Sequence, residues 1–332
     1  MCPPFRHTGH TDAAAFHATL PGYAPTPLVE VPTLAVELGV GRVLVKDESA
    51  RLHLGAFKVL GASWAIHRLL ARHLTGLPDG AALVAATDGN HGRAVAWTAR
   101  LLGLPAHVYV PHVVPARSVE AIRGEGAAVT IVTGSYDDAV RRAAGHPGGV
   151  LVQDTSWPGY EDVPRWIVDG YATLFAEVDA QLSGGHADLV VVPMGVGSLA
   201  QAAITHHDGR ATALLGVEPD SAACVLASLR AGRPTTVSTG ATIMAGLNCG
   251  TPSAAAWPLL RDGLDAAVAV TDAATALAVR DLAAVGVDSG PSGAASLAGA
   301  RAALTGHPDR RAALAVDAGS TVVLLNTEGT SG

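Results

Sequence analysis

The stretch from Lys46 to Ala62, KDESARLHLGAFKVLGA, contains both lysines of the chain, Lys46 and Lys58. The other 20 of the 22 basic residues are arginine. A primary amine whose pKa is lowered by burial can attack a carbonyl and form a Schiff base, whereas a guanidinium stays protonated. The clustering therefore predicts a site that needs an amine, although an arginine bias that spared two lysines by chance would give the same count.

The sequence around each lysine separates the two candidates. Residues 42–45 have the pattern of a short buried strand that ends at Lys46, and the apolar spacing after Lys58 is typical of a helix. Lys58 is therefore expected at a loop-to-helix junction, where Gly55 and Ala56 leave room for a flat ligand beside the backbone. We expect Lys58 to be the nucleophile and Lys46, which has two acidic neighbours, to form a structural ion pair.

Composition narrows the class of function. The 332 residues are enough for two lobes with separate cores, and charged residues make up 15%, below the roughly 25% usual in globular domains. Much of the surface is then expected to be neutral or buried between subunits. The formal net charge of −7, with no basic run, argues against nucleic acid or an anionic membrane as a partner and favours a small molecule.

Targeting and metal-binding patterns are not found in the sequence. The opening residues lack the pattern of a signal peptide, and no apolar stretch has the length of a membrane span, so a cytoplasmic location is expected. Cys2, Cys224 and Cys249 lack the spacing of zinc ligands, and we expect neither a metal site nor a disulfide framework.

Short apolar strands alternate with helices along most of the chain. Residues 81–154 contain this pattern, and it resumes after residue 171 and continues to a terminal strand that begins near residue 321. Such alternation predicts an α/β fold with parallel sheets and right-handed crossovers.

The segment PMGVGSLA, residues 193–200, places Gly195 and Gly197 between a predicted strand and a predicted helix. Backbone N–H groups converge on an anion at such a turn, so the segment predicts a phosphate-binding loop. The same letters match the dinucleotide fingerprint G-x-G-x-x-A, with Glu218 about twenty residues further on. A nicotinamide enzyme gives no reason for the clustered lysines, and its fingerprint usually opens the first strand-and-helix unit, so we favour the phosphate loop.

A second glycine loop, TDGNHG at Thr87 to Gly92, lies at another strand-to-helix junction. Its N–H groups suit the α-carboxylate of an amino acid. Asp88 is either a helix N-cap or a carboxylate of the site, and one residue can serve both purposes. His91 is expected to pack or to support neighbouring residues rather than to react.

Two further strand ends carry polar side chains. The segment VQDTSWPGY places Asp154 at a predicted strand end, which is where ligands bind in open parallel sheets. An Asx turn is the alternative for this aspartate. The segment LLNTEGT places the hydroxyl of Thr327 at the end of the last predicted strand.

Together these segments resemble the pyridoxal-phosphate enzymes of the tryptophan synthase β-subunit superfamily (fold type II), and within it most of all the diaminopropionate ammonia-lyases. The resemblance runs from about Gly22 to Gly329 and rests on KDES-R--LGAFKVLG, TDGNHGR-VAW, VQDT-W-GY, GVGS, VEPD, ATIMAGL-CG and TEG. It implies an α/β fold of two lobes, each with a mostly parallel sheet flanked by helices, and an active site between the lobes. The implied domains are a large cofactor-binding domain, residues 1–76 and 166–332, and a small domain, residues 77–165.

The resemblance also implies roles for single residues. Lys58 would hold pyridoxal 5′-phosphate, Asn90 would hydrogen-bond its phenolic oxygen, and Thr327 would face its pyridine nitrogen, where a neutral hydroxyl favours elimination over transamination. The implied catalytic residues are Lys58, Asp88 and Asp154. The expected cofactor-binding residues are Phe57, Lys58, Asn90, Gly195, Val196, Gly197, Ser198, Leu199 and Thr327, and the expected substrate-binding residues are Thr87, Asp88, Gly89, His91 and Asp154.

The reaction implied is β-elimination of ammonia from 2,3-diaminopropionate, or a close β-substituted amino acid, to give pyruvate and ammonia. Asp88 and Asp154 are the carboxylates expected to hold or protonate the departing β-nitrogen. Pro291 stands where the ammonia-lyases carry a glutamate, and the chain is shorter than usual, which leaves room for a serine or threonine dehydratase or a β-replacement synthase. A dinucleotide-dependent oxidoreductase and a cofactor-binding regulatory module are more distant alternatives. The expected partners are an amino-acid substrate and a second copy of the chain in a homodimer.

Overall fold

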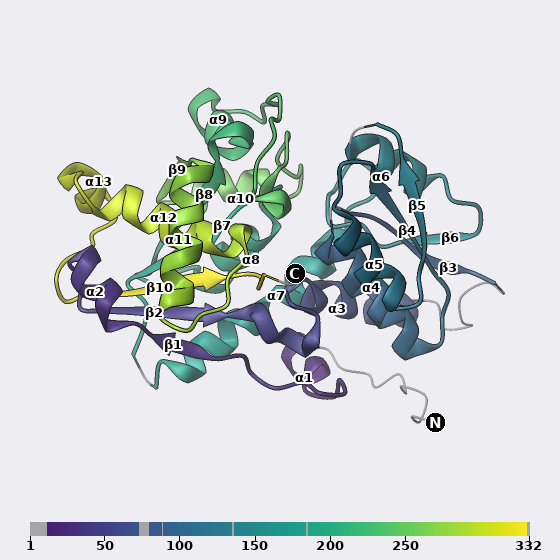
Figure 1. Ribbon diagram of the computed structural model, residues 1–332, viewed down its shortest axis with the longest axis horizontal. Helices are drawn as coiled ribbons and strands as arrows, with labels where there is room; N and C mark the ends of the chain where they lie inside the picture. Colours follow the sequence, from purple (N-terminus) through teal and green to yellow (C-terminus); the bar gives the residue numbers. More distant parts are fainter. Residues whose placement is uncertain (1–11, 73–79, 88, 135, 184, 331–332) are drawn as a thin grey trace.

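The computed structural model describes residues 12–72, 80–87, 89–134, 136–183 and 185–330. Two lobes lie side by side, and the last described residues of the chain lie between them (Figure 1). Each lobe is built on one sheet flanked by helices, so the predicted two-lobed α/β fold is confirmed. In the described part of the chain, no helix is long and apolar enough to cross a membrane.

The sheet of the large lobe has six strands in the order β1-β2-β10-β7-β8-β9. The edge strand β1 pairs antiparallel with β2, and the other pairings are parallel. The strands are rich in valine and leucine, as expected for a parallel sheet covered on both faces. Their bounds are β1 Leu28–Glu30, β2 Arg42–Asp47, β7 Leu189–Pro193, β8 Ala213–Pro219, β9 Ala266–Val270 and β10 Thr321–Asn326.

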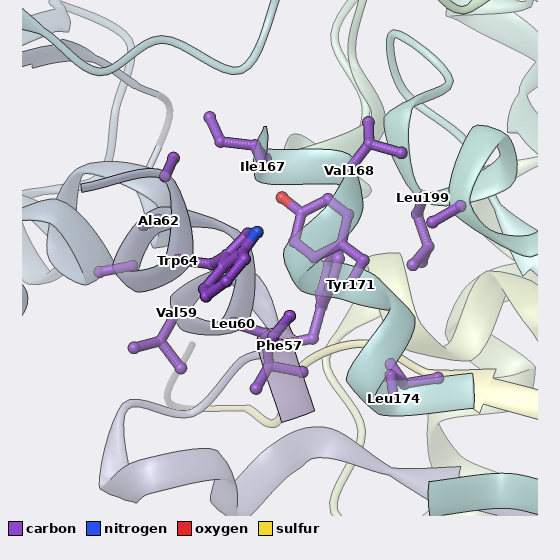
Figure 2. Packing of buried hydrophobic residues seen from close by; sticks show 14 of the residues in the cluster. Phe57, Val59, Leu60, Ala62, Trp64, Ile167, Val168, Tyr171, Leu174 and Leu199 are labelled. Atoms are coloured by element: carbon purple, nitrogen blue, oxygen red, sulfur yellow. The ribbon is translucent and has the colours of Figure 1, made fainter. Parts of the chain in front are cut away.

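Alternate side chains of this sheet enter two different cores. Val190 and Val192 belong to the core that contains the buried residues of α3, α7 and α8, whereas Leu189 and Val191 belong to the core that contains those of α2, α11 and α12. Figure 2 shows the first core, where Phe57 and Tyr171 meet with ring centroids 4.7 Å apart. The helix bounds are α1 Ala13–His17, α2 Pro32–Leu38, α3 Lys58–Arg72, α7 Asp162–Gln181, α8 Ser198–His207, α9 Cys224–Ala231, α10 Trp257–Gly263, α11 Asp272–Ala284, α12 Pro291–Leu304 and α13 Pro308–Ala313.

The sheet of the small lobe is parallel throughout, in the order β5-β4-β3-β6. Leu83 and Ala85 face the helices α4 and α5, and Val84 and Ala86 face α6. The bounds are β3 Ala82–Ala86, β4 Ala106–Pro111, β5 Ala128–Val132, β6 Gly149–Leu151, α4 Asn90–Leu102, α5 Ala116–Gly124 and α6 Tyr136–Ala144. The predicted boundary between residues 165 and 166 falls inside α7, and the domain limits stay a prediction.

Helix α12 is the main element that the sequence pattern did not predict. Its segment PSGAASLAGARAAL is made of small residues on all sides and has no apolar stripe, so helical periodicity is weak. Small residues are required there because the helix lies directly on the sheet. A Cβ atom at Gly299 would lie 2.2 Å from Val217, and one at Gly293 would lie 2.2 Å from Asn326 Oδ1.

Candidate active site

A cavity of about 550 Å³ is lined by residues of both lobes. This volume is within the range of roughly 300–1,000 Å³ typical of small-molecule sites. Among the described lining residues the charged ones are Lys58, Asp154 and Glu328. The lining also contains Phe57, Asn90, Gly195, Val196, Gly197, Ser198, Leu199 and Thr327, so the structure brings together all the residues predicted to bind the cofactor.

Lys58 is the first residue of α3 and reaches across the cavity to the small-lobe side. Its Nζ donates a hydrogen bond to Asp154 Oδ2 at 2.8 Å and lies 5.5 Å from the centre of the Phe57 ring. The side chain of Lys58 is 22% exposed and that of Asp154 is 9% exposed. Burial alone would raise the pKa of Asp154, but the Lys58 ammonium outweighs burial and holds that pKa well below its usual range. Asp154 is therefore ionised beside the amine.

Asp154 follows β6 by three residues, and its backbone carbonyl is hydrogen-bonded to the predicted phosphate-binding loop. Ser198 Oγ donates to the Asp154 carbonyl at 3.2 Å, and Gln153 Nε2 donates to Asp154 Oδ1 at 3.3 Å. Because Ser198 begins α8, the phosphate-loop residues and the carboxylate hold each other in place.

The predicted phosphate-binding loop lies at the amino-terminal end of α8. Gly197 is its N-cap with φ 97°, a left-handed conformation that favours glycine, and a Cβ atom there would lie 2.5 Å from Leu260. The first bond of α8 runs from Gln201 N–H to the Gly197 carbonyl, so the preceding N–H groups have no partner within the helix. These N–H groups, beside a cavity, fit a phosphate.

The loop TDGNHG is organised by the Thr87 hydroxyl, which accepts hydrogen bonds from Gly89 N–H at 2.9 Å and Gly92 N–H at 3.1 Å. Asn90 begins α4 and lines the cavity. His91 is 2% exposed, and its Nε2 lies 2.7 Å from the Val152 carbonyl. Burial lowers the pKa of His91, so the ring is neutral and donates to that carbonyl.

Thr87, Gly89 and His91 are not among the described residues that line the cavity. Their predicted contacts with substrate therefore stay predictions. Asp88, predicted above to be a catalytic and substrate-binding carboxylate, lies outside the described residues, as does Cys2.

Thr327 and Glu328 follow β10 at the floor of the cavity. Thr327 is 4% exposed, and its carbonyl accepts the Phe57 N–H at 3.2 Å. Glu328 lines the cavity and was not singled out from the sequence. Its Oε2 accepts from Asn90 Nδ2 at 2.6 Å, and its Oε1 accepts from Ser292 N–H at 3.1 Å. An acidic residue directly after a buried apolar strand, in the segment TEG, was the signal that could have identified it.

The other lysine has a structural role, as predicted, but its partner is distant in sequence. Lys46 is 0% exposed, and its Nζ lies 2.6 Å from Glu177 Oε2 on α7. Glu177 also accepts from Arg51, which in turn binds Glu48 at 2.7 Å. Two cations and two carboxylates thus form a balanced buried cluster beneath the segment that leads to Lys58, and an amine bound in this way is not available as a nucleophile.

Glu218, on which the dinucleotide alternative depended, is occupied in capping a helix. It is 0% exposed and accepts the N–H groups of Val225 and Leu226, each at 2.8 Å, at the start of α9. Burial raises its pKa to about 7. A carboxylate that is enclosed in this way cannot contact the ribose of a dinucleotide.

The two cysteines that the structure describes lie close to the phosphate-binding loop. Cys224 is buried, its Sγ lies 3.8 Å from the Gly195 carbonyl, and burial raises the pKa of its thiol to about 12. Cys249 is half-buried and lines the cavity.

The same cavity is lined by an amine beside a carboxylate and by a helix amino terminus that fits a phosphate. This combination suits a cofactor that carries both a carbonyl group and a phosphate. The model of the family described as pyridoxal-phosphate dependent enzyme matches residues 19–328, and the chain belongs to this family. Its cofactor is pyridoxal phosphate. The residues present fit this cofactor: Lys58 at the start of α3 offers the amine, the glycine-rich start of α8 offers N–H groups for the phosphate, and Asn90 and Thr327 line the same cavity.

The chain is similar to the diaminopropionate ammonia-lyase of Salmonella typhimurium, with 39% identity over 97% of this chain and 89% of that protein. It also matches the crystal structure of diaminopropionate ammonia lyase from Escherichia coli in complex with an aminoacrylate-PLP azomethine reaction intermediate. That match has a TM-score of 0.88 and 36% identity, and it covers 96% of this chain and 88% of that one. The structure of maize serine racemase is more distant, with a TM-score of 0.81 and 26% identity over 96% of this chain and 91% of that one.

Proposed function

We propose that the enzyme eliminates ammonia from 2,3-diaminopropionate and so yields pyruvate and ammonia. The observation that carries the proposal is the pair of Lys58 and Asp154, an amine and an ionised carboxylate 2.8 Å apart in one cavity. Diaminopropionate ammonia-lyases are 37% to 39% identical to this chain over nearly its full length, which supports the same reaction class.

The proposed division of labour between the cofactor and the chain begins at the substrate Cα. Pyridoxal phosphate, when bound, supplies an electron sink that stabilises negative charge at this carbon. Lys58 would hold the cofactor through its amine before the substrate binds, and the freed amine would be the group that takes the Cα proton. The start of α8 would hold the phosphate, and the Phe57 ring lies 5.5 Å from the Lys58 amine.

Asp154 is the proposed partner of the leaving nitrogen. A neutral amine is a poor leaving group, so the β-nitrogen has to depart as an ammonium. Burial opposes ionisation of Asp154, and the positive charge of Lys58 outweighs it and lowers the pKa of Asp154. Once Lys58 is joined to the cofactor, a β-ammonium of the substrate in the same place would likewise keep Asp154 ionised and able only to accept hydrogen bonds. It is therefore suited to hold the β-ammonium while the bond to carbon breaks, rather than to supply the proton itself.

The charge of the cavity distinguishes the proposed substrate from serine or threonine. One cation and two carboxylates, Asp154 and Glu328, lie among the described lining residues. When Lys58 is joined to the cofactor, the carboxylates have no neighbouring lysine ammonium and favour a substrate with a second amine over one with a neutral hydroxyl. A dehydratase is the second candidate function. It is supported by the similarity to the L-threonine dehydratase of Mycobacterium leprae, which is 34% identical over 65% of this chain and 49% of that protein.

The experiment is a visible spectrum of the purified protein followed by a substrate screen. L- and D-diaminopropionate, serine, threonine and O-acetylserine are each supplied, and the release of 2-oxo acid and of ammonia is measured. Faster release from diaminopropionate supports the proposal. A higher kcat/KM for serine or threonine would make the enzyme a dehydratase, and capture of an added thiol would make it a replacement synthase. A yellow protein that turns over none of these would be a regulatory module.

We also propose that the enzyme is a cytoplasmic homodimer. The low charged fraction of 15% supports burial of surface between subunits, and Val36 on α2 and Leu277 on α11 are large apolar side chains that are 84% and 45% exposed. Light scattering of the purified protein tests the subunit number, and a mass of 33.5 kDa, that of one chain, would overturn this proposal.

A further inference from the structure

Glu328 is held at the cavity more tightly than a surface glutamate would be. Its carbonyl accepts the Gly290 N–H at 2.9 Å, and its backbone bridges to Ala56 in an antiparallel pair. A Cβ atom added at Gly290 would lie 3.0 Å from both Glu328 Cγ and Oε1. The carboxylate therefore has a fixed position, with one oxygen directed at the start of α12 and the other at Asn90.

The contact with Asn90 joins the two lobes across the cavity. Asn90 begins α4 beside the small-lobe sheet, and Glu328 follows the last strand of the large-lobe sheet, 238 residues away. Both oxygens of Glu328 accept N–H groups, which is the arrangement of an ionised carboxylate. Burial raises the pKa of Glu328, while the donors at Ser292 and Asn90 and the nearby Lys58 ammonium oppose that rise.

An asparagine amide can present either its nitrogen or its oxygen to a ligand, and its neighbours decide which. A carboxylate accepts only, so Glu328 holds the Asn90 nitrogen on its side, and the second N–H on the same nitrogen is left for the cavity that Asn90 lines. We propose that Glu328 is a positioning residue that fixes the Asn90 amide so that it donates to the phenolic oxygen of pyridoxal phosphate. This inference rests on that contact of Asn90 with the cofactor and goes beyond the proposed reaction.

The orientation of the Asn90 amide would decide the protonation state of the cofactor's phenolic oxygen. An N–H donated to the phenolic oxygen stabilises its anionic form, which in a bound pyridoxal Schiff base absorbs in the visible. A carbonyl in the same place would favour the protonated phenol, which absorbs in the near ultraviolet. Glu328 thus sets the visible absorbance and the electron-accepting state of the cofactor through Asn90.

The test compares Glu328→Gln with Glu328→Asp in the cofactor-loaded protein, without substrate. Glutamine matches glutamate in shape, but its amide can donate as well as accept hydrogen bonds. The Asn90 amide can then rotate by about 180° and place its oxygen, instead of its nitrogen, toward residue 328 and the cofactor. We expect Glu328→Gln to shift absorbance from the visible to the near-ultraviolet band and to weaken cofactor retention roughly tenfold, the loss of about one charge-assisted hydrogen bond. Glu328→Asp, shorter but accepting only, should keep the visible band. If Glu328 only filled space, the shorter Glu328→Asp would disturb the visible band more than the equally large Glu328→Gln.

The variant Asn90→Ala, which lacks the amide, is used to test whether Glu328 acts through Asn90. If Glu328 acts through Asn90, adding Glu328→Gln to Asn90→Ala leaves the ratio of the two bands unchanged. A band ratio in Glu328→Gln equal to that of the wild type overturns the proposal, as does an additive shift in the double variant. Circular dichroism checks that each variant is folded. If Glu328→Gln does not fold, the band ratio of Glu328→Asp is the test. A ratio in Glu328→Asp that is shifted as far from the wild type as that of Asn90→Ala would overturn the proposal. The spectra need no turnover, so their outcome is separate from that of the substrate screen.

Discussion

The Lys58 ammonium donates a hydrogen bond to Asp154 Oδ2 at 2.8 Å, although 96 residues separate them along the chain. Lys58 begins α3, which packs against α7 and α4, and Asp154 follows the small-lobe strand β6. The pair therefore spans the cavity, and any change in the spacing of the lobes changes the distance between amine and carboxylate.

The first prediction concerns which lysine carries the cofactor. Borohydride reduction of the yellow protein should fix the cofactor to Lys58, because the Lys46 amine is fully buried and bound by Glu177, Gln181 and the Thr26 carbonyl. Peptide mapping has two possible lysine sites in this chain, so it gives a clear answer. Lys58→Arg is the matched control, since arginine keeps the positive charge beside Asp154 but cannot form the bond. A label on Lys46 would refute the assignment.

The second prediction concerns Asp154. The change Asp154→Asn keeps shape and removes the charge that is proposed to hold the β-ammonium, so kcat for diaminopropionate should fall about a hundredfold or more while the protein stays yellow. Steady-state kinetics and the visible spectrum are measured on the same sample. Asp162→Asn is the control, because Asp162 is a surface carboxylate paired with Arg72 and Arg165. Unchanged turnover in Asp154→Asn would show that this carboxylate has no part in the reaction.

The third prediction concerns Asp88 and rests on the resemblance of its loop to that of the ammonia-lyases. A carboxylate on the substrate face opposite Lys58 would act as a second base, so Asp88→Asn should keep the cofactor and lose turnover of D-diaminopropionate far more than of L-diaminopropionate. Escherichia coli diaminopropionate ammonia lyase, which this chain resembles in structure, has been crystallised in complex with D-serine. Equal loss for both enantiomers would assign Asp88 to the leaving group or to helix capping. No loss would remove it from the mechanism.

The fourth prediction concerns the buried cluster of Lys46, Arg51, Glu48 and Glu177. Glu177→Gln leaves two cations with one carboxylate, and breaking a buried ion pair in this way costs about 3–5 kcal/mol of unfolding free energy. Denaturant unfolding at neutral pH measures the loss. The matched control is Glu30→Gln, whose exposed pair with Arg42 should contribute no measurable stability. Equal midpoints for Glu177→Gln and the wild type would contradict the prediction.

The same cluster predicts a pH dependence. Burial opposes ionisation of Glu177, but Arg51 and Lys46 outweigh burial and lower its pKa from the ordinary 4.5 to about 2. The native state therefore binds this proton less tightly than the unfolded chain, and the stabilisation is complete above pH 4.5 and is lost as the pH falls towards 2. The stability difference between wild type and Glu177→Gln should consequently be smaller at about pH 3 than at neutral pH. A difference that grows on acidification would show the opposite sign of linkage.

The fold class and half of the site could be predicted from local sequence because they depend on local chemistry. Apolar strands alternating with helices predict parallel sheets wherever they occur, and a helix opened by Gly197 exposes N–H groups whatever surrounds it. Lys58 could be identified because only an amine performs its chemistry. Helix α12 could not be predicted in this way. It is buried on most sides, so its sequence has no polar face that would alternate with an apolar face at the helical period.

What the tertiary structure decided is which side chains meet. The strand order places β2, β10 and β7 side by side although they lie at opposite ends and in the middle of the chain. That order brings Glu177 to Lys46 across 131 residues and Glu328 to Asn90 across 238. Residue type and spacing along the chain do not predict such pairs. The energy of a hydrogen bond or ion pair depends on distance in space, and only the packed sheets and helices determine that distance.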